Sequence, residues 1–198
     1  MARTATPTET EEDVVVTAEH IFIQALMSRG YMPETKAKAL YKAAARIDDD
    51  SGFDAFWGDI HKRLDPVGLG IRRIYFKGDK TTYLGVVNLH NDDHSQLATH
   101  LTEQQIAYAR ALFEEIKDSE EQALTAIDCL NLKLRQPDGT QPAEGEEPGL
   151  TQIVADMSGG DKEFVLNHLV GEGWLYSEGG QVSFGPRAQL ELHAMLET

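Results

Sequence analysis

The sequence has 198 residues, 41% of them hydrophobic, and its 33 acidic and 18 basic residues give a formal charge of -15. This length suits one large globular domain or two small ones. Affinity for nucleic acid comes largely from lysine and arginine that neutralise phosphates, so the charge excludes a broad nucleic-acid-binding surface and leaves only local contacts. The single cysteine, Cys129, excludes a disulfide framework and any multi-cysteine zinc site within this chain.

The N-terminal residues differ in composition from the rest of the chain. Residues 1–15 are rich in threonine and glutamate and have few large apolar side chains, which predicts a disordered acidic tail. They also lack the apolar core of a secretory signal, and no run approaches the ~18 apolar residues of a membrane span. These features together predict an intracellular protein.

The next segment has the element order of a winged helix. A first helix is predicted from a cap at Thr17 to Gly30, a second after Pro33, and a third over "FDAFWGDIHKRL", which has the strongest amphipathic pattern in the chain. Two runs rich in β-branched and aromatic residues, "GIRRIYF" and "TTYLGVVNL", follow and are joined by "KGDK". Three helices and then a hairpin predict winged helix 1 over residues 16–100.

The same pattern then begins again. Thr102 and Gln105 predict a capping box, helical runs follow, and a segment rich in Pro, Gly and Glu predicts a mobile loop at residues 135–149. A further helix over "DKEFVLNHLVGEG" precedes two short strands with a turn at Gly179 and Gly180, and Pro186 begins a closing helix. We predict winged helix 2 over residues 101–198. The fold class is therefore α+β, mostly helical, with two tandem winged-helix domains.

Motifs for catalysis or metal binding are weak. His90, His94 and His100 are spaced closely enough for zinc, but the Asn-Asp-Asp between them favours a turn and an exposed connector between the domains. The "KGDKTT" segment lacks the first glycine of a phosphate loop, and no nucleophile elbow or H-E-x-x-H motif occurs. We therefore predict no catalysis, no cofactor and no bound metal for this chain.

One basic cluster stands out on the first hairpin. It consists of four residues within nine positions, Arg72, Arg73, Lys77 and Lys80. A winged helix that binds DNA reads bases with its third helix and touches phosphate with its wing. Both predicted third helices carry acidic residues, such as Asp54 and Asp161, so neither suits base recognition. The cluster is either a local phosphate contact or an ordinary solvated strand surface.

The first helix is apolar on two sides. Phe22 and Leu26 lie on one side, whereas Ile23 and Met27 lie on another. The apolar surface of such a helix is wider than one small domain can be expected to bury. Ile23 and Met27 therefore mark a candidate partner interface, and the alternative is that the second winged helix covers them.

Several motifs in order also resemble a known family. They are "IFIQALMSRGYMPETKAKALYKAAARI", "DPVGLGIRRIYFKGDKTTYLGVVNL", "LATHLTEQQIAYARALFEEI", "AIDCLNL" and "GEGWLYSEGGQVSFGPRAQLEL". From about residue 19 onward the chain resembles the non-SMC element 1 subunit of the structural maintenance of chromosomes five-six complex.

The resemblance implies a function that the residue patterns alone do not give. It implies tandem winged helices that bind a MAGE-type subunit, with a kleisin subunit nearby, in a nuclear complex for recombinational DNA repair and chromosome maintenance. In such proteins a variant RING domain with zinc ligands follows and supports ubiquitin ligase activity. This chain has no C-x-x-C motif, so no RING and no ligase activity are expected in it.

Three functions of different classes remain as hypotheses. The first is a protein-interaction subunit of the repair complex, which the acidic third helices and the two-sided first helix favour. The second is a free-standing winged-helix DNA-binding regulator, which needs a basic third helix. The third is a ubiquitin ligase acting through this chain alone, against which the missing zinc ligands argue.

Overall fold

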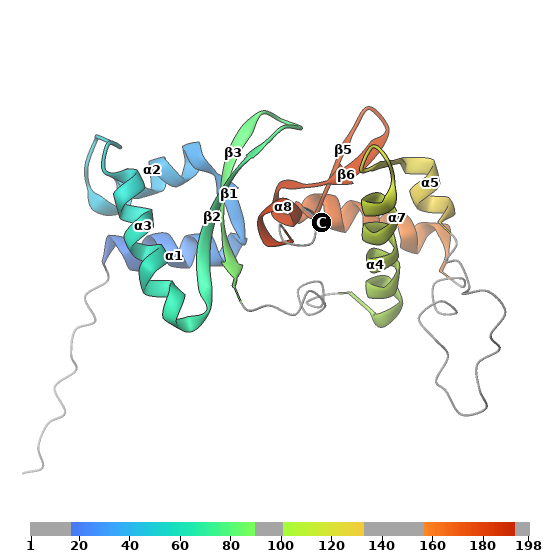
Figure 1. Cartoon of the computed structure of the whole chain (residues 1–198), viewed down its shortest axis with the longest axis horizontal. Coiled ribbons are helices and arrows are strands. Elements are labelled where there is room, and N and C mark those ends of the chain that lie inside the picture. Colours follow the sequence, from blue (N-terminus) through green and yellow to red (C-terminus); the bar gives the residue numbers. More distant parts are fainter. Residues whose placement is uncertain (1–16, 90–100, 133–156, 193–198) are drawn as a thin grey trace, which may run out of the picture.

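The computed structural model describes residues 17–89, 101–132 and 157–192. Within these ranges the chain forms two winged-helix units side by side, the first in blue to green and the second in yellow to red (Figure 1). The predicted fold class is thus confirmed. The predicted tail at 1–15, the loop at 135–149, the end of the first unit at residue 100 and the three histidines His90, His94 and His100 lie outside the described residues.

The first unit follows the predicted order, with one short strand added. Its elements are α1 (Ala18–Arg29), β1 (Tyr31–Pro33), α2 (Glu34–Ala45), α3 (Phe53–Leu64), the 3-10 turn η1 (Asp65–Val67), β2 (Leu69–Phe76) and β3 (Thr81–Asn88). The strands form an antiparallel sheet in the order β1-β3-β2. β2 is therefore an edge strand of this sheet.

The second unit repeats this order with shorter strands. Its described elements are α4 (Glu103–Asp118), β4 (Ala123–Thr125), α5 (Ala126–Asn131), α7 (Gly159–Gly171), β5 (Leu175–Glu178), β6 (Gln181–Phe184) and α8 (Pro186–Glu191). Its antiparallel sheet has the order β4-β6-β5, which matches the first sheet strand for strand.

Local sequence signals fix the helix ends. Thr17 and Thr102 each accept a hydrogen bond from the backbone N–H three residues later, and Gln105 completes the predicted capping box by accepting from the N–H of Thr102. Gly30 ends α1 with φ of 74°, a conformation that costs glycine little. Gly179 and Gly180 likewise have positive φ in the predicted turn between β5 and β6.

Each unit has its own hydrophobic core. In the first unit the core includes Phe22, Leu26 and Phe53, with the ring of Phe53 in edge contact with that of Phe22 at 6.1 Å between centroids. In the second unit α4 contributes the fully buried Tyr108 and Leu112, which lie with Leu169 of α7. The Tyr108 hydroxyl donates to the carbonyl oxygen of Cys129 at 2.8 Å, so its polar group is satisfied inside the core.

The two units meet where α8 packs on the outer face of the first sheet. Gly85 of β3 makes this approach possible, because a Cβ there would lie 2.8 Å from Leu190 Cδ1 and 3.1 Å from the carbonyl oxygen of Gly30. The ring of Phe76 at the end of β2 contacts that of Tyr176 in β5, with centroids 5.1 Å apart. The first sheet is therefore covered on one face by its own helices and on the other by α8 (Figure 1).

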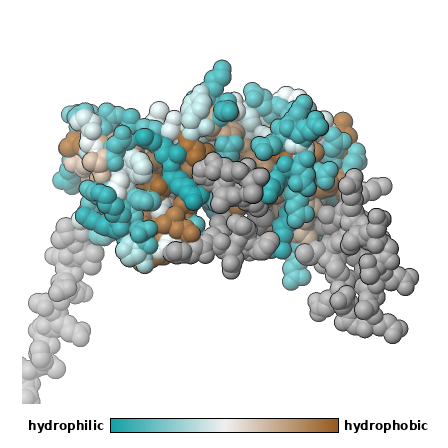
Figure 2. Space-filling view, viewed as in Figure 1, coloured by the Kyte–Doolittle hydropathy of each residue, from teal (hydrophilic) through white to brown (hydrophobic). Residues whose placement is uncertain are grey.

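Surface hydropathy shows no dominant apolar face in the view of Figure 2. Hydrophilic residues cover most of that face, and hydrophobic areas are small and separate. No helix among the described residues is long and apolar enough to cross a membrane.

Candidate protein-interaction surfaces

The first candidate surface lies on α1, and the structure separates the two predicted interface residues. Met27 is 53% exposed, and Ile21 one and a half turns earlier is 39% exposed. Ile23 is only half-buried but packs against the first core. The second unit packs on the sheet instead of covering Met27, so the outer side of α1 is left open to solvent near Met27.

The second candidate surface is the hairpin, where the four predicted basic residues do not form one patch. Neighbouring side chains in a strand point to opposite faces. Arg72 points to the outer face, where its Nη1 donates to the carbonyl oxygen of Leu190 at 2.9 Å. Arg73 points to the helices of its own unit. Lys77 and Lys80 lie near and in the turn and are exposed.

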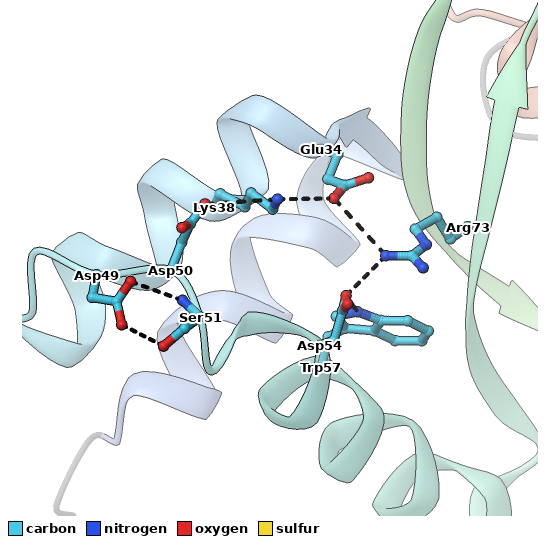
Figure 3. A network of polar contacts seen from close by, with 8 residues as sticks. All are labelled: Glu34, Lys38, Asp49, Asp50, Ser51, Asp54, Trp57 and Arg73. Carbon is cyan, nitrogen blue, oxygen red and sulfur yellow. Dashed lines mark hydrogen bonds and ion pairs between the residues drawn. The ribbon is translucent and has the colours of Figure 1, made fainter.

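Arg73 is the centre of a network of charged side chains on the helix side of the sheet. Its guanidinium lies 2.8 Å from Asp54 Oδ1 and 3.9 Å from Glu34 Oε1, with its Cζ 5.6 Å from the ring centroid of Trp57 (Figure 3). Lys38 extends the network because it pairs with Glu34 at 3.3 Å. The hydrogen bond from the Trp57 indole and the charge of Arg73 lower the pKa of Asp54.

This network changes the interpretation of the basic cluster. Arg72 and Arg73 already have partners within this chain. The exposed side of α3 carries Asp54 and Asp59 beside Lys62 and Arg63, and those two cations are ion-paired as well. Phosphate contact through the hairpin stays a prediction. Within the cluster, the side chains of Lys77 and Lys80 form no ion pair or hydrogen bond with another described residue.

Arg187 lies at the contact between the two units and is fixed there by partners from its own unit. It forms ion pairs with Glu191 at 2.7 Å and Glu172 at 3.1 Å, and its Cζ lies 4.5 Å from the centroid of the Trp174 ring. Burial raises the pKa of Glu191, and Arg187 opposes that effect. The guanidinium also lies against Gly30 of the first unit, where an added Cβ would be 3.4 Å from Cζ. Sequence reasoning missed this residue: Glu191 at i+4 is a local signal, whereas Glu172 and Trp174 are too distant in sequence to give one.

Two features of the described residues concern metal binding and the reactivity of the single cysteine. No group of three or more histidine, cysteine, aspartate or glutamate side chains lies close enough to hold a metal ion in the described ranges. Cys129 is fully buried, and burial raises the pKa of its thiol to about 11, which disfavours the reactive thiolate. Cys129 therefore behaves as a packed core residue.

Comparisons with known proteins agree with the family resemblance in the sequence. Residues 19–192 match the family described as the Nse1 non-SMC component of the SMC5-6 complex. The chain is 26% identical over 182 residues to the non-structural maintenance of chromosomes element 1 homolog of Xenopus tropicalis, covering 89% of this chain and 62% of that protein. The Homo sapiens homolog is 25% identical over 86% of this chain and 60% of its own length.

A solved structure described as an Nse1-Nse3-Nse4 complex contains a chain of the same fold. It has a TM-score of 0.70 and 24% sequence identity, and the match covers 92% of this chain and 74% of that one. The chain thus spans about three fifths of the length of the curated relatives it matches. With the family match extending across both winged-helix units, the chain belongs to the Nse1 family of non-SMC components of the SMC5-6 complex.

Proposed function

We propose that this chain is a protein-interaction subunit of an SMC5-6 complex, and that its tandem winged helices dock on a MAGE-type subunit with a kleisin subunit nearby. The observation that carries the proposal is the family match, which runs from residue 19 to residue 192 through both units. The similar solved structure, which is named for a complex of Nse1 with Nse3 and Nse4, supports partners of these two kinds.

The surface of the molecule favours this function over DNA reading. Asp54 and Asp59 occupy the exposed side of α3, where a winged-helix regulator needs basic residues, and each is paired with a cation of its own unit. A free-standing DNA-binding regulator is therefore the weaker proposal. Nuclear localisation and a role in DNA repair and chromosome maintenance follow from the proposed membership in the complex.

No ligase activity is proposed for this chain. The RING and its zinc belong, by the family resemblance, to full-length members of the family, and this sequence contains no C-x-x-C motif. Ubiquitin transfer by longer relatives would then depend on residues without a counterpart here.

We place part of the MAGE-type interface on α1 around Met27. A methionine that is 53% exposed beside a completed core is available to a partner, and its flexible thioether suits an adaptable apolar contact. Ile23 lies on the same helix, but Ile23→Asp would place a carboxylate against the core of the first unit. Met27→Asp is therefore the more informative change.

The test is titration of the chain with a MAGE-type subunit by calorimetry, together with co-elution. We expect a one-to-one complex, and Met27→Asp should weaken it about tenfold or more while the unfolding midpoint changes little. Gln104→Asp is the matched control, since Gln104 is an exposed polar residue of α4 in the second unit, away from α1. Failure of the wild-type chain to form a complex would refute the function, whereas equal affinity of both variants would refute only the interface.

A further inference from the structure

A groove between the two units lies apart from α1. It has a volume of about 580 Å³ and is lined by residues 74–78 of the first hairpin on one side and by Glu121, Phe184 and Gln189 of the second unit on the other. Tyr75 in its wall is 59% exposed. Two elements from different units thus form a groove with both apolar and polar walls.

The strand that borders this groove has an open hydrogen-bonding edge. β2 pairs only with β3 in its sheet, and the register joins Arg72 to Gly85 and Ile74 to Tyr83. The backbone of the intervening odd-numbered residues faces away from β3, as the N–H of Ile71 shows by donating to His61 Nδ1 at 2.9 Å.

Beyond Ile71, this edge has no partner in the described part of the chain. No hydrogen bond joins the outward backbone of Arg73 or Tyr75 to another described residue. Unpaired edge groups are a template for an added strand, and many proteins bind extended peptides in this way. The open stretch ends at the groove, which Tyr75 lines.

The basic side chains at the groove favour an added strand that carries acidic residues. In a chain of formal charge -15, several basic side chains are held in ion pairs, such as Arg63 with Glu19 and Arg187 with Glu191. Lys77 and Lys80 have no carboxylate within 4.0 Å among the described residues. Two unneutralised cations therefore stand at the end of the open edge, where carboxylates of a partner would be attracted.

We propose that the edge of β2 and the adjoining groove bind an extended acidic peptide segment of a partner protein. The backbone of the segment pairs with the outward groups of Tyr75 and Arg73, its carboxylates face Lys77 and Lys80, and its alternate apolar side chains lie on the groove wall that includes Phe184. This site is distinct from the α1 surface proposed for the MAGE-type subunit, and the inference does not depend on that docking.

Duplex DNA fits the same features less well. A phosphate backbone cannot use the open N–H and C=O groups of an edge strand as a ladder, and its closely spaced charges would also meet Asp79 and Glu121. A peptide can place apolar residues near Glu121 and acidic residues only near the two lysines. The charge and the open edge together therefore favour a peptide.

The experiment measures fluorescence anisotropy of a labelled octapeptide of alternating glutamate and valine on addition of the full chain. We expect saturable binding, weakened at least fivefold by the double variant Lys77→Glu and Lys80→Glu. The matched control is Lys36→Glu with Lys42→Glu on α2, outside the groove, which carries the same change in charge and should leave affinity within twofold. Circular dichroism of each variant checks that it is folded.

Two further measurements separate strand pairing from attraction between charges. An acidic peptide of equal charge with proline at alternate positions lacks the N–H groups needed for a ladder and should bind at least fivefold more weakly. Hydrogen exchange should show protection of the Tyr75 amide when the alternating peptide is bound.

The proposal is overturned if the alternating peptide does not bind, if the lysine variants bind it as well as the control does, or if the proline peptide binds equally. It is also overturned if a 20-base-pair duplex binds more tightly than the peptide with the same dependence on Lys77 and Lys80, since the site would then be one for phosphate.

Discussion

The first and second winged helices share their strand order but use their sheets differently. In the first unit β2 and β3 have eight residues each, and the sheet packs on its own helices with one face and on α8 with the other. In the second unit β5 and β6 have four residues each. The longer sheet thus provides both the contact between the units and the open edge. The strands of the second sheet are too short to offer an edge of equal length.

The helix α8 belongs to both units, and this sharing couples them. Ala188 and Leu192 complete the core of the second unit, whereas Leu190 lies between them against Gly85 of the first sheet. Each unit also has one tryptophan, Trp57 in the first and Trp174 in the second. Fluorescence of Trp57→Phe and Trp174→Phe variants therefore reports on the two units separately.

The largest effects are expected from core truncations that test whether the units unfold together. Phe53→Ala in the first core and Leu169→Ala in the second should each lower the free energy of unfolding by about 3–4 kcal/mol, because both side chains are almost fully buried. Urea titrations of the single-tryptophan proteins should show coincident transitions for each truncation. Transitions that separate by more than about 1 M urea would show that α8 does not couple the units.

The second largest effect is a pH dependence of stability that comes from the buried thiol of Cys129 in the second unit. Burial raises the pKa of Cys129 from the ordinary value of 9.0 to about 11. The folded state then holds more protons between these values, so stability falls as the pH rises through this window. Relative to Cys129→Ala, the wild type should lose about 3 kcal/mol between pH 9 and 11. Parallel stability curves for the two proteins would contradict this assignment.

A smaller loss of stability is expected from a substitution at Gly173, where the two units touch. This residue has φ of 77°, and a Cβ there would overlap the ring and hydroxyl of Tyr31 in the first unit. Gly173→Ala should cost about 1–3 kcal/mol and separate the two fluorescence transitions. Adding Tyr31→Ala should restore coincident transitions if the overlap is the cause, whereas the strain of positive φ would remain.

The smallest effect is expected from the network around Arg73. Asp54→Asn removes the charge that pairs with Arg73, and because Asp54 is mostly exposed the loss of stability should be smaller than that of Gly173→Ala. Raising the salt concentration should reduce the difference between wild type and variant further. A loss of stability in thermal unfolding as large as that of Gly173→Ala would mean that the network contributes substantially to the stability of the first unit.

Much of the fold could be predicted because its signals are local. Thr102 with Gln105, the amphipathic run of α3 and the Gly179-Gly180 turn each depend on a few neighbouring residues, and the structure confirms all of them. The strands β1 and β4 were not predicted, since three residues are too few to show an alternating pattern and Pro33 lies within β1.

The surfaces were harder to predict, because they depend on contacts between distant residues. Sequence spacing gathered Arg72 and Arg73 into one cluster, yet strand geometry sends them to opposite faces, toward Leu190 and Asp54. Helical periodicity placed Ile23 beside Met27, but only the packing of α1 shows that Ile23 rests on the core. The importance of Arg187 likewise depends in part on Glu172 and Trp174, which no local pattern connects to it.

The hydrogen bond between Arg72 and Leu190 joins residues 118 positions apart, and this separation has a consequence for synthesis of the chain. At about 5–20 residues per second, the ribosome needs roughly 6–24 s after making β2 before α8 exists. During that interval the outer face of the first sheet, with Phe76 and Tyr83, has no cover from its later partner. The nascent first unit is therefore a natural client for chaperones, and slowing translation after β3 should lower the soluble yield.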